Sequence, residues 1–129
     1  MRLIDSHTHL YFDDYEPSPE SAVERALGAG VVHMVLPGVN REAIAPARRL
    51  HERYPDCTSI AVGLHPCDVK EGIMEEELEI VDRELNENPG FYCAVGEVGI
   101  DLHWDKTTID LQMQAFDRQA RKALSLGLP

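Results

Sequence analysis

Two histidines separated by one residue lie near the start of the chain, in the segment Asp5-Ser6-His7-Thr8-His9. On an extended backbone, residues two apart point to the same side, so the imidazoles of His7 and His9 face the same space. Two such imidazoles can hold one metal ion, at about 2.0–2.2 Å each for zinc. The alternative is a turn whose polar residues happen to be histidines. The apolar pair Leu3-Ile4 directly before the segment favours a metal site.

A carboxylate in unusual surroundings lies in the segment Gly96-Glu97-Val98-Gly99. The segment follows an apolar stretch, residues 91–95, so Glu97 is poorly explained as a solvated surface charge. Burying a charge without a partner is very costly, and a metal ion is a natural partner for a carboxylate. The two oxygens of a carboxylate can also bridge two metal ions. The alternative is a glutamate that accepts hydrogen bonds from backbone amides of its loop.

Three further side chains are candidates for binding a substrate. His65, in the segment Gly63-Leu64-His65-Pro66, could hydrogen-bond a phosphate or simply hold its loop. Asp101 could orient a ligand, or it could cap the turn that follows it. Trp104 could stack on an unpaired base or pack within the protein.

The elements that must position these residues are strands alternating with helices. Apolar stretches predict strands over 3–4, 31–36, 58–62 and 91–95, and helical spacing predicts helices that begin after Ser18, after Asn40, near Met74 and near Ile109. Pro46 predicts a kink or a late start in the second helix. The strands are apolar on both faces, as buried parallel strands are, and the alternation indicates a parallel sheet. Because functional groups gather at the carboxyl ends of such strands, the candidates should converge on one edge.

Length and charge limit the possible functions. The chain has 129 residues, with 12 basic and 23 acidic side chains, so its formal net charge is −11. It offers no extended basic surface for nucleic acid, so a polyanionic substrate would need local positive charge such as divalent metal ions. The length suits one domain over residues 1–129, but four strand–helix units are too few for a closed barrel of about 250 residues. The lack of a signal-peptide core near the first residue predicts a cytoplasmic location.

Three motifs occur together in this order: Asp5-Ser6-His7-Thr8-His9-Leu10, Ala61-Val62-Gly63-Leu64-His65-Pro66 and Gly96-Glu97-Val98-Gly99-Ile100-Asp101. With Gln112, Gln114-Ala115-Phe116 and Leu126-Gly127-Leu128-Pro129, the pattern resembles the TatD family of metal-dependent deoxyribonucleases over essentially the whole chain. The resemblance implies the N-terminal half, four βα units, of a TIM-type (β/α)8 barrel of the metallo-dependent hydrolase kind. It also implies two divalent ions (Mg²⁺, Mn²⁺ or Zn²⁺) and hydrolysis of phosphodiester bonds in DNA, of 3′-to-5′ exonuclease type.

The same resemblance assigns roles to three residues of this chain. It implies that His7 and His9 bind one metal ion and that Glu97 bridges both ions at the catalytic centre. The metal ions would lower the pKa of a shared water and stabilise negative charge on the phosphoryl oxygens. Metal ions bound at such a site would supply the local positive charge that this strongly acidic chain needs to attract a polyanionic substrate.

Two departures from the family pattern change what we expect. The family often has an acidic residue soon after the segment His9-Leu10, where this chain has Tyr11 and Phe12. Either Asp13 and Asp14 replace that residue, or its contact is missing. The sequence ends at Pro129, where the fifth strand of the family begins. Later strands supply two more histidines and an aspartate to the metals. We therefore expect the isolated chain to bind metal weakly, to have little or no nuclease activity, and to need a C-terminal half or self-association.

Two other functions remain open on the sequence. One is an amidohydrolase that acts on small amides or esters, although many such enzymes use a modified lysine where this chain has Glu97. The other is a non-catalytic truncated barrel that serves as an assembly or binding module.

Overall fold

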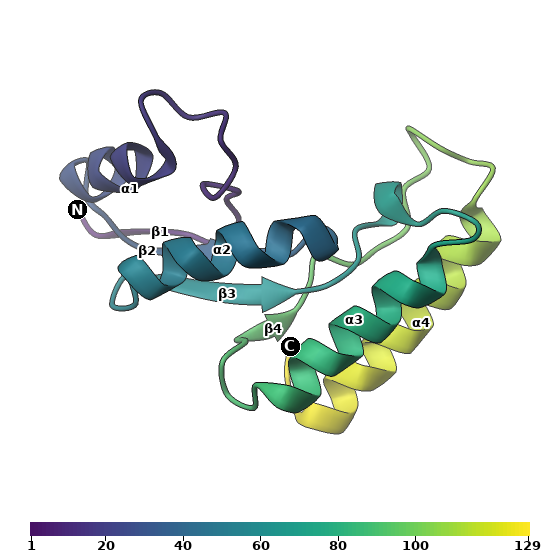
Figure 1. The fold of residues 1–129 in the computed structure, drawn as a ribbon. Coiled ribbons are helices and arrows are strands. Elements are labelled where there is room, and N and C mark those ends of the chain that lie inside the picture. The colour runs from purple at the N-terminus through teal and green to yellow at the C-terminus, as the bar shows by residue number, and fades with distance from the viewer.

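The computed structural model describes residues 1–129 and contains four strands that alternate with four α-helices (Figure 1). In chain order the elements are β1 (Leu3–Asp5), α1 (Pro19–Gly28), β2 (Val31–Leu36), α2 (Arg41–Arg53), β3 (Thr58–Val62), the 3₁₀ helix η1 (Pro66–Asp68), α3 (Met74–Glu87), β4 (Ala94–Val95) and α4 (Ile109–Leu126). The strands form one parallel sheet in the order β1-β2-β3-β4. The predicted order of elements and the parallel sheet are thus confirmed.

Local sequence signals explain where the first two helices begin. The Ser18 hydroxyl accepts a hydrogen bond from the backbone amide of Ser21, and Pro19 occupies the first helical position of α1. The side chain of Asn40 caps α2 in the same way. Such caps satisfy amide groups that have no partner within the helix. The connections after β1 and β2 are therefore defined by the sequence itself.

Two details of the prediction are wrong. Of the two outcomes expected from Pro46, the late start is wrong, because α2 begins at Arg41 and contains Pro46 in its second turn, whereas the kink stays a prediction. The proline removes only the donor for the carbonyl of Glu42, an exposed residue whose carbonyl water can reach. Strand β4 has two residues rather than five. The preceding residues 91–93 are irregular, and of these three only Tyr92 is buried in the core, at 3% exposed.

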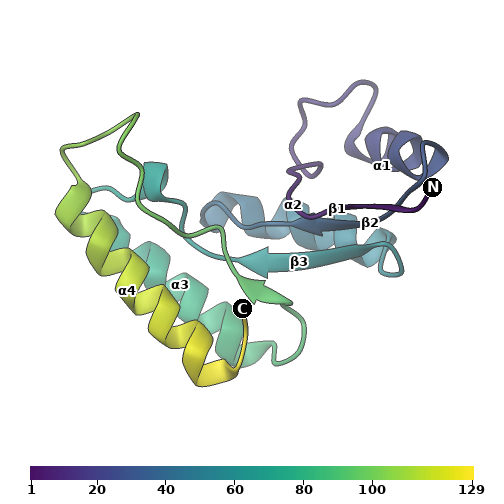
Figure 2. The same ribbon diagram turned by 180° about the vertical axis from the view of Figure 1, so that it is seen from behind.

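The helices cover one side of the sheet. Helix α2 lies in front of β1–β3 in Figure 1 and behind them in Figure 2, so the opposite face of these strands has no helix over it. Helices α3 and α4 pack side by side, with α4 against β4. Ile4 on β1 is consequently 68% exposed. The expectation of strands buried on both faces is therefore wrong for β1, because helices cover only one side of it.

The core lies between the sheet and its helices. Its largest cluster joins side chains from β2, β3, α1 and α2, among them Met34, Leu36, Ile60, Val62, Val23 and Leu50. A smaller cluster joins the segment after β3 to α3 and α4 through Leu64, Val69, Met74, Leu78 and Ala115. The two clusters hold the carboxyl ends of the strands in place. None of the helices is both long enough and apolar enough to cross a membrane.

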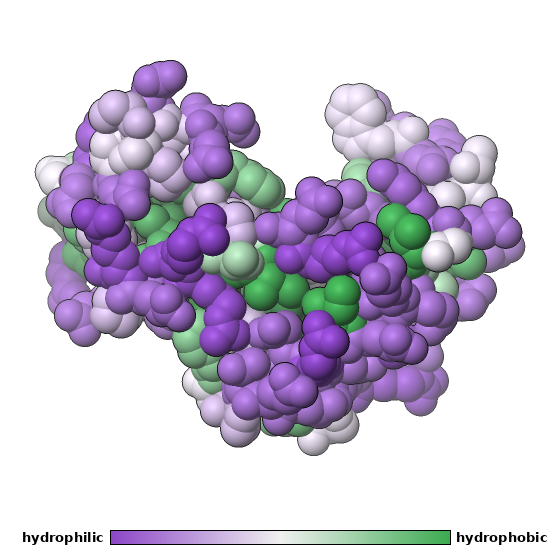
Figure 3. Space-filling model, in the orientation of Figure 1, coloured by the Kyte–Doolittle hydropathy of each residue, from purple (hydrophilic) through white to green (hydrophobic).

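The space-filling view shows that this face of the molecule is hollowed along its upper edge (Figure 3). One side of the hollow is built by α1 and the loop before it, and the other side by η1 and the loop between β4 and α4. The carboxyl ends of the strands point toward this region, so the candidate residues that follow the strands lie near the hollow.

Candidate metal centre

Three glycines bring the ends of β2, β3 and β4 close together. The amide of Gly38 donates to the carbonyl of Gly96 at 2.8 Å, and the amide of Glu97 donates back to the carbonyl of Gly38 at 2.9 Å. A Cβ atom on Gly63 would lie 2.8 Å from the carbonyl carbon of Gly96, and one on Gly38 would lie 2.7 Å from the amide nitrogen of Gly63. Only glycine fits such close backbone approaches. The backbone of Glu97 is thereby fixed where the strands end.

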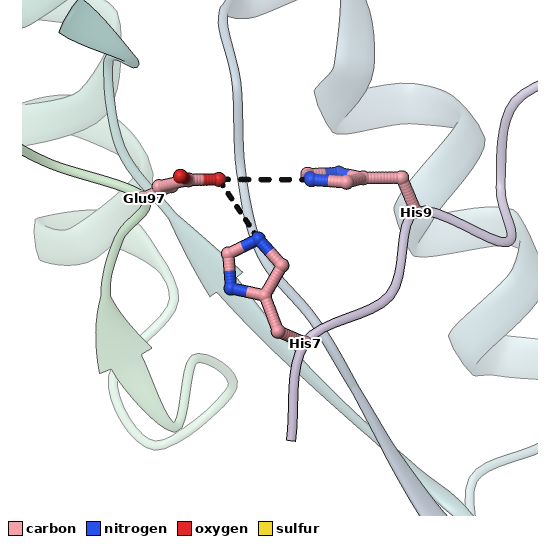
Figure 4. A group of neighbouring side chains, drawn as sticks. All are labelled: His7, His9 and Glu97. Atoms are coloured by element: carbon pink, nitrogen blue, oxygen red, sulfur yellow. Dashed lines mark ion pairs between the residues drawn. The ribbon is translucent and has the colours of Figure 1, made fainter. Parts of the chain in front are cut away.

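The side chains of His7, His9 and Glu97 converge on one point at this edge (Figure 4). Oε2 of Glu97 lies 3.0 Å from Nε2 of His7 and 3.6 Å from Nε2 of His9. The three ligand atoms all lie within 4.8 Å of one another. Ligands held about 2.1 Å from one ion are roughly 3.0–3.4 Å apart in octahedral or tetrahedral geometry. The donor set and its spacing therefore fit a divalent metal ion with small movements of the side chains.

The convergence predicted from the sequence is present in the structure. His7 and His9 come from the loop after β1, and Glu97 comes from the loop after β4, at the two ends of the sheet order. The side chain of His7 is 52% exposed and that of Glu97 is 29% exposed. The group is thus open to solvent on one side, as a site that receives a substrate must be. Its role in metal binding stays a prediction.

The surroundings of His9 favour its neutral form. Partial burial lowers the pKa of His9 below the ordinary 6.5, repulsion between its protonated ring and that of His7 lowers it further, and the negative charge of Glu97 opposes both. A neutral imidazole is the form that binds a metal ion. His9 is therefore ready to act as a ligand at neutral pH.

A tyrosine missed by the sequence analysis contacts His9. The hydroxyl oxygen of Tyr11 lies 2.7 Å from Nδ1 of His9, and its O–H donates to the carbonyl of Pro37 at 2.6 Å. Tyr11 is 2% exposed, and burial followed by the charge of Glu97 raises its pKa. The candidates Asp13 and Asp14 make no hydrogen bond to His9. Replacement of the family's acidic residue by Asp13 or Asp14 stays a prediction, and the side chain that contacts His9 here is Tyr11.

His65 lies on the other side of the Glu97 carboxylate. Its Nε2 is 3.4 Å from Oε1 of Glu97, the oxygen that faces away from the first two histidines. Its Nδ1 accepts a hydrogen bond from the amide of Cys67 at 3.1 Å, which caps η1. When neutral, His65 therefore carries its proton on Nε2 and is a donor there. The hydrogen bond from Cys67 agrees with the interpretation that His65 holds its loop, whereas binding of a phosphate by His65 stays a prediction.

Asp101 and Trp104 lie outside the convergent group. One carboxylate oxygen of Asp101 accepts from the amides of His103 at 2.9 Å and Trp104 at 2.7 Å, so Asp101 caps its turn as one interpretation predicted. The hydrogen bond from Trp104 is the main cause that lowers the pKa of Asp101. The indole of Trp104 is 78% exposed on the loop between β4 and α4, which contradicts a packing role. Substrate binding by either residue stays a prediction.

Two buried glutamines tie α4 to the loops of the site. Gln119 accepts a hydrogen bond from the amide of Leu64 at 2.7 Å and donates to the carbonyl of the same residue at 3.2 Å. Gln112 accepts from the amide of Asp101 at 2.7 Å. The two glutamines are 2% and 0% exposed. The sequence analysis missed Gln119, although its spacing of two helical turns from Gln112 on the apolar face of α4 was a usable signal.

The comparisons with known proteins identify the family. The model of the family described as TatD related DNase matches residues 4–129. The chain therefore belongs to the TatD family of metal-dependent hydrolases, as the motifs indicated.

Relatives and a solved structure show how far the likeness extends. The chain is 35% identical over 127 residues to the uncharacterized metal-dependent hydrolase YabD of Bacillus subtilis, covering 98% of this chain and 48% of that protein. It is also 35% identical over 127 residues to the 3′-5′ ssDNA/RNA exonuclease TatD of Citrobacter koseri, covering 98% and 47%. The crystal structure of YjjV, a TatD homologue from Escherichia coli K12, superposes with a TM-score of 0.88 at 32% identity, covering 99% and 49%.

The chain spans about half the length of the curated relatives it matches. Its four parallel βα units form a half-barrel and correspond to half of the TatD barrel structures. The predicted fold class is thereby confirmed.

Proposed function

We propose that this chain contributes His7, His9 and Glu97 to the metal centre of a hydrolase that cleaves phosphodiester bonds in DNA, in the 3′-to-5′ direction. The observation that carries the proposal is the convergence of three ligand atoms within 4.8 Å at the carboxyl edge of the sheet. Membership of the TatD family supports it, as does the likeness to the Citrobacter koseri protein, which is named a 3′-5′ ssDNA/RNA exonuclease. As a single domain over residues 1–129, the chain would supply half of the complete site.

The side chains of the site have separate tasks under this proposal. His7, His9 and Glu97 would hold one ion, because Nε2 of both histidines lies beside Oε2 of Glu97. Glu97 would also be the residue shared with the second ion that the family implies, and His65 lies beside its other oxygen. When bound, divalent ions such as Mg²⁺, Mn²⁺ or Zn²⁺ place positive charge near the phosphoryl oxygens and make water a stronger nucleophile.

His65 is one of the side chains that we propose to contact the substrate. Its Nε2–H is a donor beside the Glu97 carboxylate, and a phosphate oxygen bound next to that carboxylate could accept from it. The exposed indole of Trp104 offers an apolar face to an unpaired base, and Asp101 holds the turn that presents it. With a net charge of −11, the protein itself repels DNA, so bound cations are needed to attract the substrate.

Metal binding is tested by titrating the purified chain with Zn²⁺ in a calorimeter. We expect a single weak site, because the chain supplies only three ligands. Glu97→Gln should lower its affinity by more than about 100-fold, since even an outer hydrogen-bonding partner of a ligand is worth about 10–100-fold. Glu76→Gln, on the exposed start of α3, is the matched control and should bind like the parent chain. Equal affinity in the Glu97 variant contradicts the proposed centre.

Activity is tested on single-stranded DNA labelled at its 5′ end, with Mg²⁺, Mn²⁺ or Zn²⁺. The isolated chain should shorten the DNA slowly or not at all, so the decisive protein is a chimera in which residues 1–129 replace the matching half of the Citrobacter koseri exonuclease. We expect the chimera to remove nucleotides from the 3′ end, and His7→Ala or Glu97→Gln to abolish this. A folded chimera without nuclease activity, or one that these changes leave active, contradicts the proposal.

A further inference from the structure

The ring of His9 is held by two neighbours that follow it in sequence. Phe12 stacks on the imidazole, with ring centroids 5.7 Å apart and planes 28° apart. Tyr11 meets it edge-on, and its hydroxyl oxygen is 2.7 Å from Nδ1. The ring plane and one of its two nitrogens are thus fixed before any ligand arrives.

The hydroxyl of Tyr11 has a single proton, and the structure shows where it lies. The tyrosine oxygen is 2.6 Å from the carbonyl oxygen of Pro37, and a carbonyl can only accept. Two oxygens at that distance need a proton between them, so the O–H of Tyr11 is directed to Pro37. The short contact to His9 must then use a proton that the imidazole supplies from Nδ1.

We propose that Tyr11 is a positioning residue that holds the proton of His9 on Nδ1 and so presents the Nε2 lone pair to the metal ion. This inference rests on the proposed metal centre. A neutral imidazole has one N–H, and which nitrogen carries it is set by the partner of the other nitrogen. With Nδ1 donating to Tyr11, Nε2 is left free, and Nε2 is the atom that lies 3.6 Å from Oε2 of Glu97.

The arrangement also joins two strands of the sheet. Tyr11 follows the metal-binding loop after β1, whereas Pro37 is the first residue after β2. Because Tyr11 is 2% exposed, water does not compete for its hydroxyl. The carbonyl of Pro37 therefore directs the tyrosine proton, and the tyrosine oxygen directs the histidine proton.

The tautomer of His9 can be measured without metal in the chain of natural sequence. Two-bond ¹H–¹⁵N correlation spectra of the histidine-labelled chain, recorded in EDTA well above pH 6.5, show which ring nitrogen carries the proton. The His9 signals are assigned by their loss in His9→Asn. We expect the Nδ1–H form for His9. The Nε2–H form, which free imidazoles favour in water, overturns the inference.

Tyr11→Phe removes the hydroxyl and keeps the ring. We expect the spectrum of His9 to move toward the Nε2–H form and the Zn²⁺ affinity to fall by about 10–100-fold. The matched control is Tyr92→Phe, which removes the hydroxyl of another buried tyrosine. Tyr92 precedes β4, whereas Glu97 follows it, and the hydroxyl of Tyr92 donates to Glu84 outside the site. It should leave the spectrum and the affinity unchanged.

The outcomes separate this inference from the proposed function. If Tyr11→Phe, folded by near-ultraviolet circular dichroism, keeps both the tautomer and the affinity while Glu97→Gln loses zinc, only the role of Tyr11 is overturned. If zinc binding is insensitive to Glu97→Gln, the proposed centre fails, and the tautomer measured in EDTA still decides what Tyr11 does to His9.

Discussion

Adding one methyl group at Gly63 should disturb both the fold and the metal centre. In Gly63→Ala the new Cβ would lie 2.8 Å from the carbonyl carbon and 3.0 Å from the Cα of Gly96. Both neighbours are backbone atoms, so no side chain can rotate to make room. The ends of β3 and β4 must move apart by several tenths of an ångström to restore ordinary contact.

The size of the effect follows from this crowding. Forcing an extra carbon into a packed region costs typically about 1–3 kcal/mol, which for a domain of this size lowers the Tm by roughly 4–15 °C. Glu97 directly follows Gly96, so the same movement shifts its carboxylate relative to His9, where the two ligand atoms are 3.6 Å apart. We expect the Zn²⁺ affinity to fall by about tenfold or more, since metal sites need ligands placed within about 0.5 Å.

The assay compares thermal unfolding and zinc titration of the parent chain with two alanine variants. Gly28→Ala is the control, because its Cβ would meet no atom within 4 Å and the residue lies at the end of α1. It should keep the zinc affinity and gain about 0.5–1 kcal/mol of stability. If Gly63→Ala melts and binds zinc like the parent chain, the close approach of these glycines does not control the site, and the reasoning is refuted.

Three other predictions concern the surroundings of the site. Gln119→Leu leaves the amide and carbonyl of Leu64 buried without their side-chain partner, so urea unfolding should show a loss of about 2–4 kcal/mol, whereas the exposed Gln114→Leu should lose nothing; equal losses would contradict this. Burial lowers the pKa of His51 in the folded chain below the ordinary 6.5 that it has in the unfolded chain. At a pH between the folded and the unfolded pKa, the unfolded chain binds more protons, so the free energy of unfolding should fall as the pH drops from 6.5 toward the folded pKa. His51→Asn, which retains a donor for Thr58, should flatten this fall in urea titrations in EDTA, and an unchanged slope would refute it. Zn²⁺ at about 100 times its Kd should stabilise the chain by roughly 2.7 kcal/mol and EDTA should reverse this; an identical Tm in both conditions would show that the folded state does not bind zinc.

The sequence predicted those features that depend on neighbouring residues. Apolar stretches and capping residues located the strands and helices, because each is decided within a few positions of the chain. The convergence of His9 and Glu97 was also predictable, since the carboxyl ends of parallel strands must lie at one edge. Strand β4 was predicted too long, because apolar residues such as Tyr92 signal burial in the core as readily as strand pairing.

Contacts between distant segments could not be predicted from the sequence alone. The hydrogen bond from the hydroxyl of Tyr11 to the carbonyl of Pro37 depends on the pairing of β1 with β2, because the two residues are 26 positions apart in the sequence. No local sequence pattern predicts this contact. The close approach of Gly63 to Gly96 likewise depends on the pairing of β3 with β4. Such contacts, rather than the ligands themselves, set the orientation of the site.

A crystal structure of the chain soaked in Zn²⁺, with data collected on both sides of the zinc absorption edge, would test the central claim most directly. We predict an anomalous peak about 2.0–2.2 Å from Nε2 of His7, Nε2 of His9 and an oxygen of Glu97. Zinc bound elsewhere, with these three side chains left without an ion, would contradict the assignment of the metal centre.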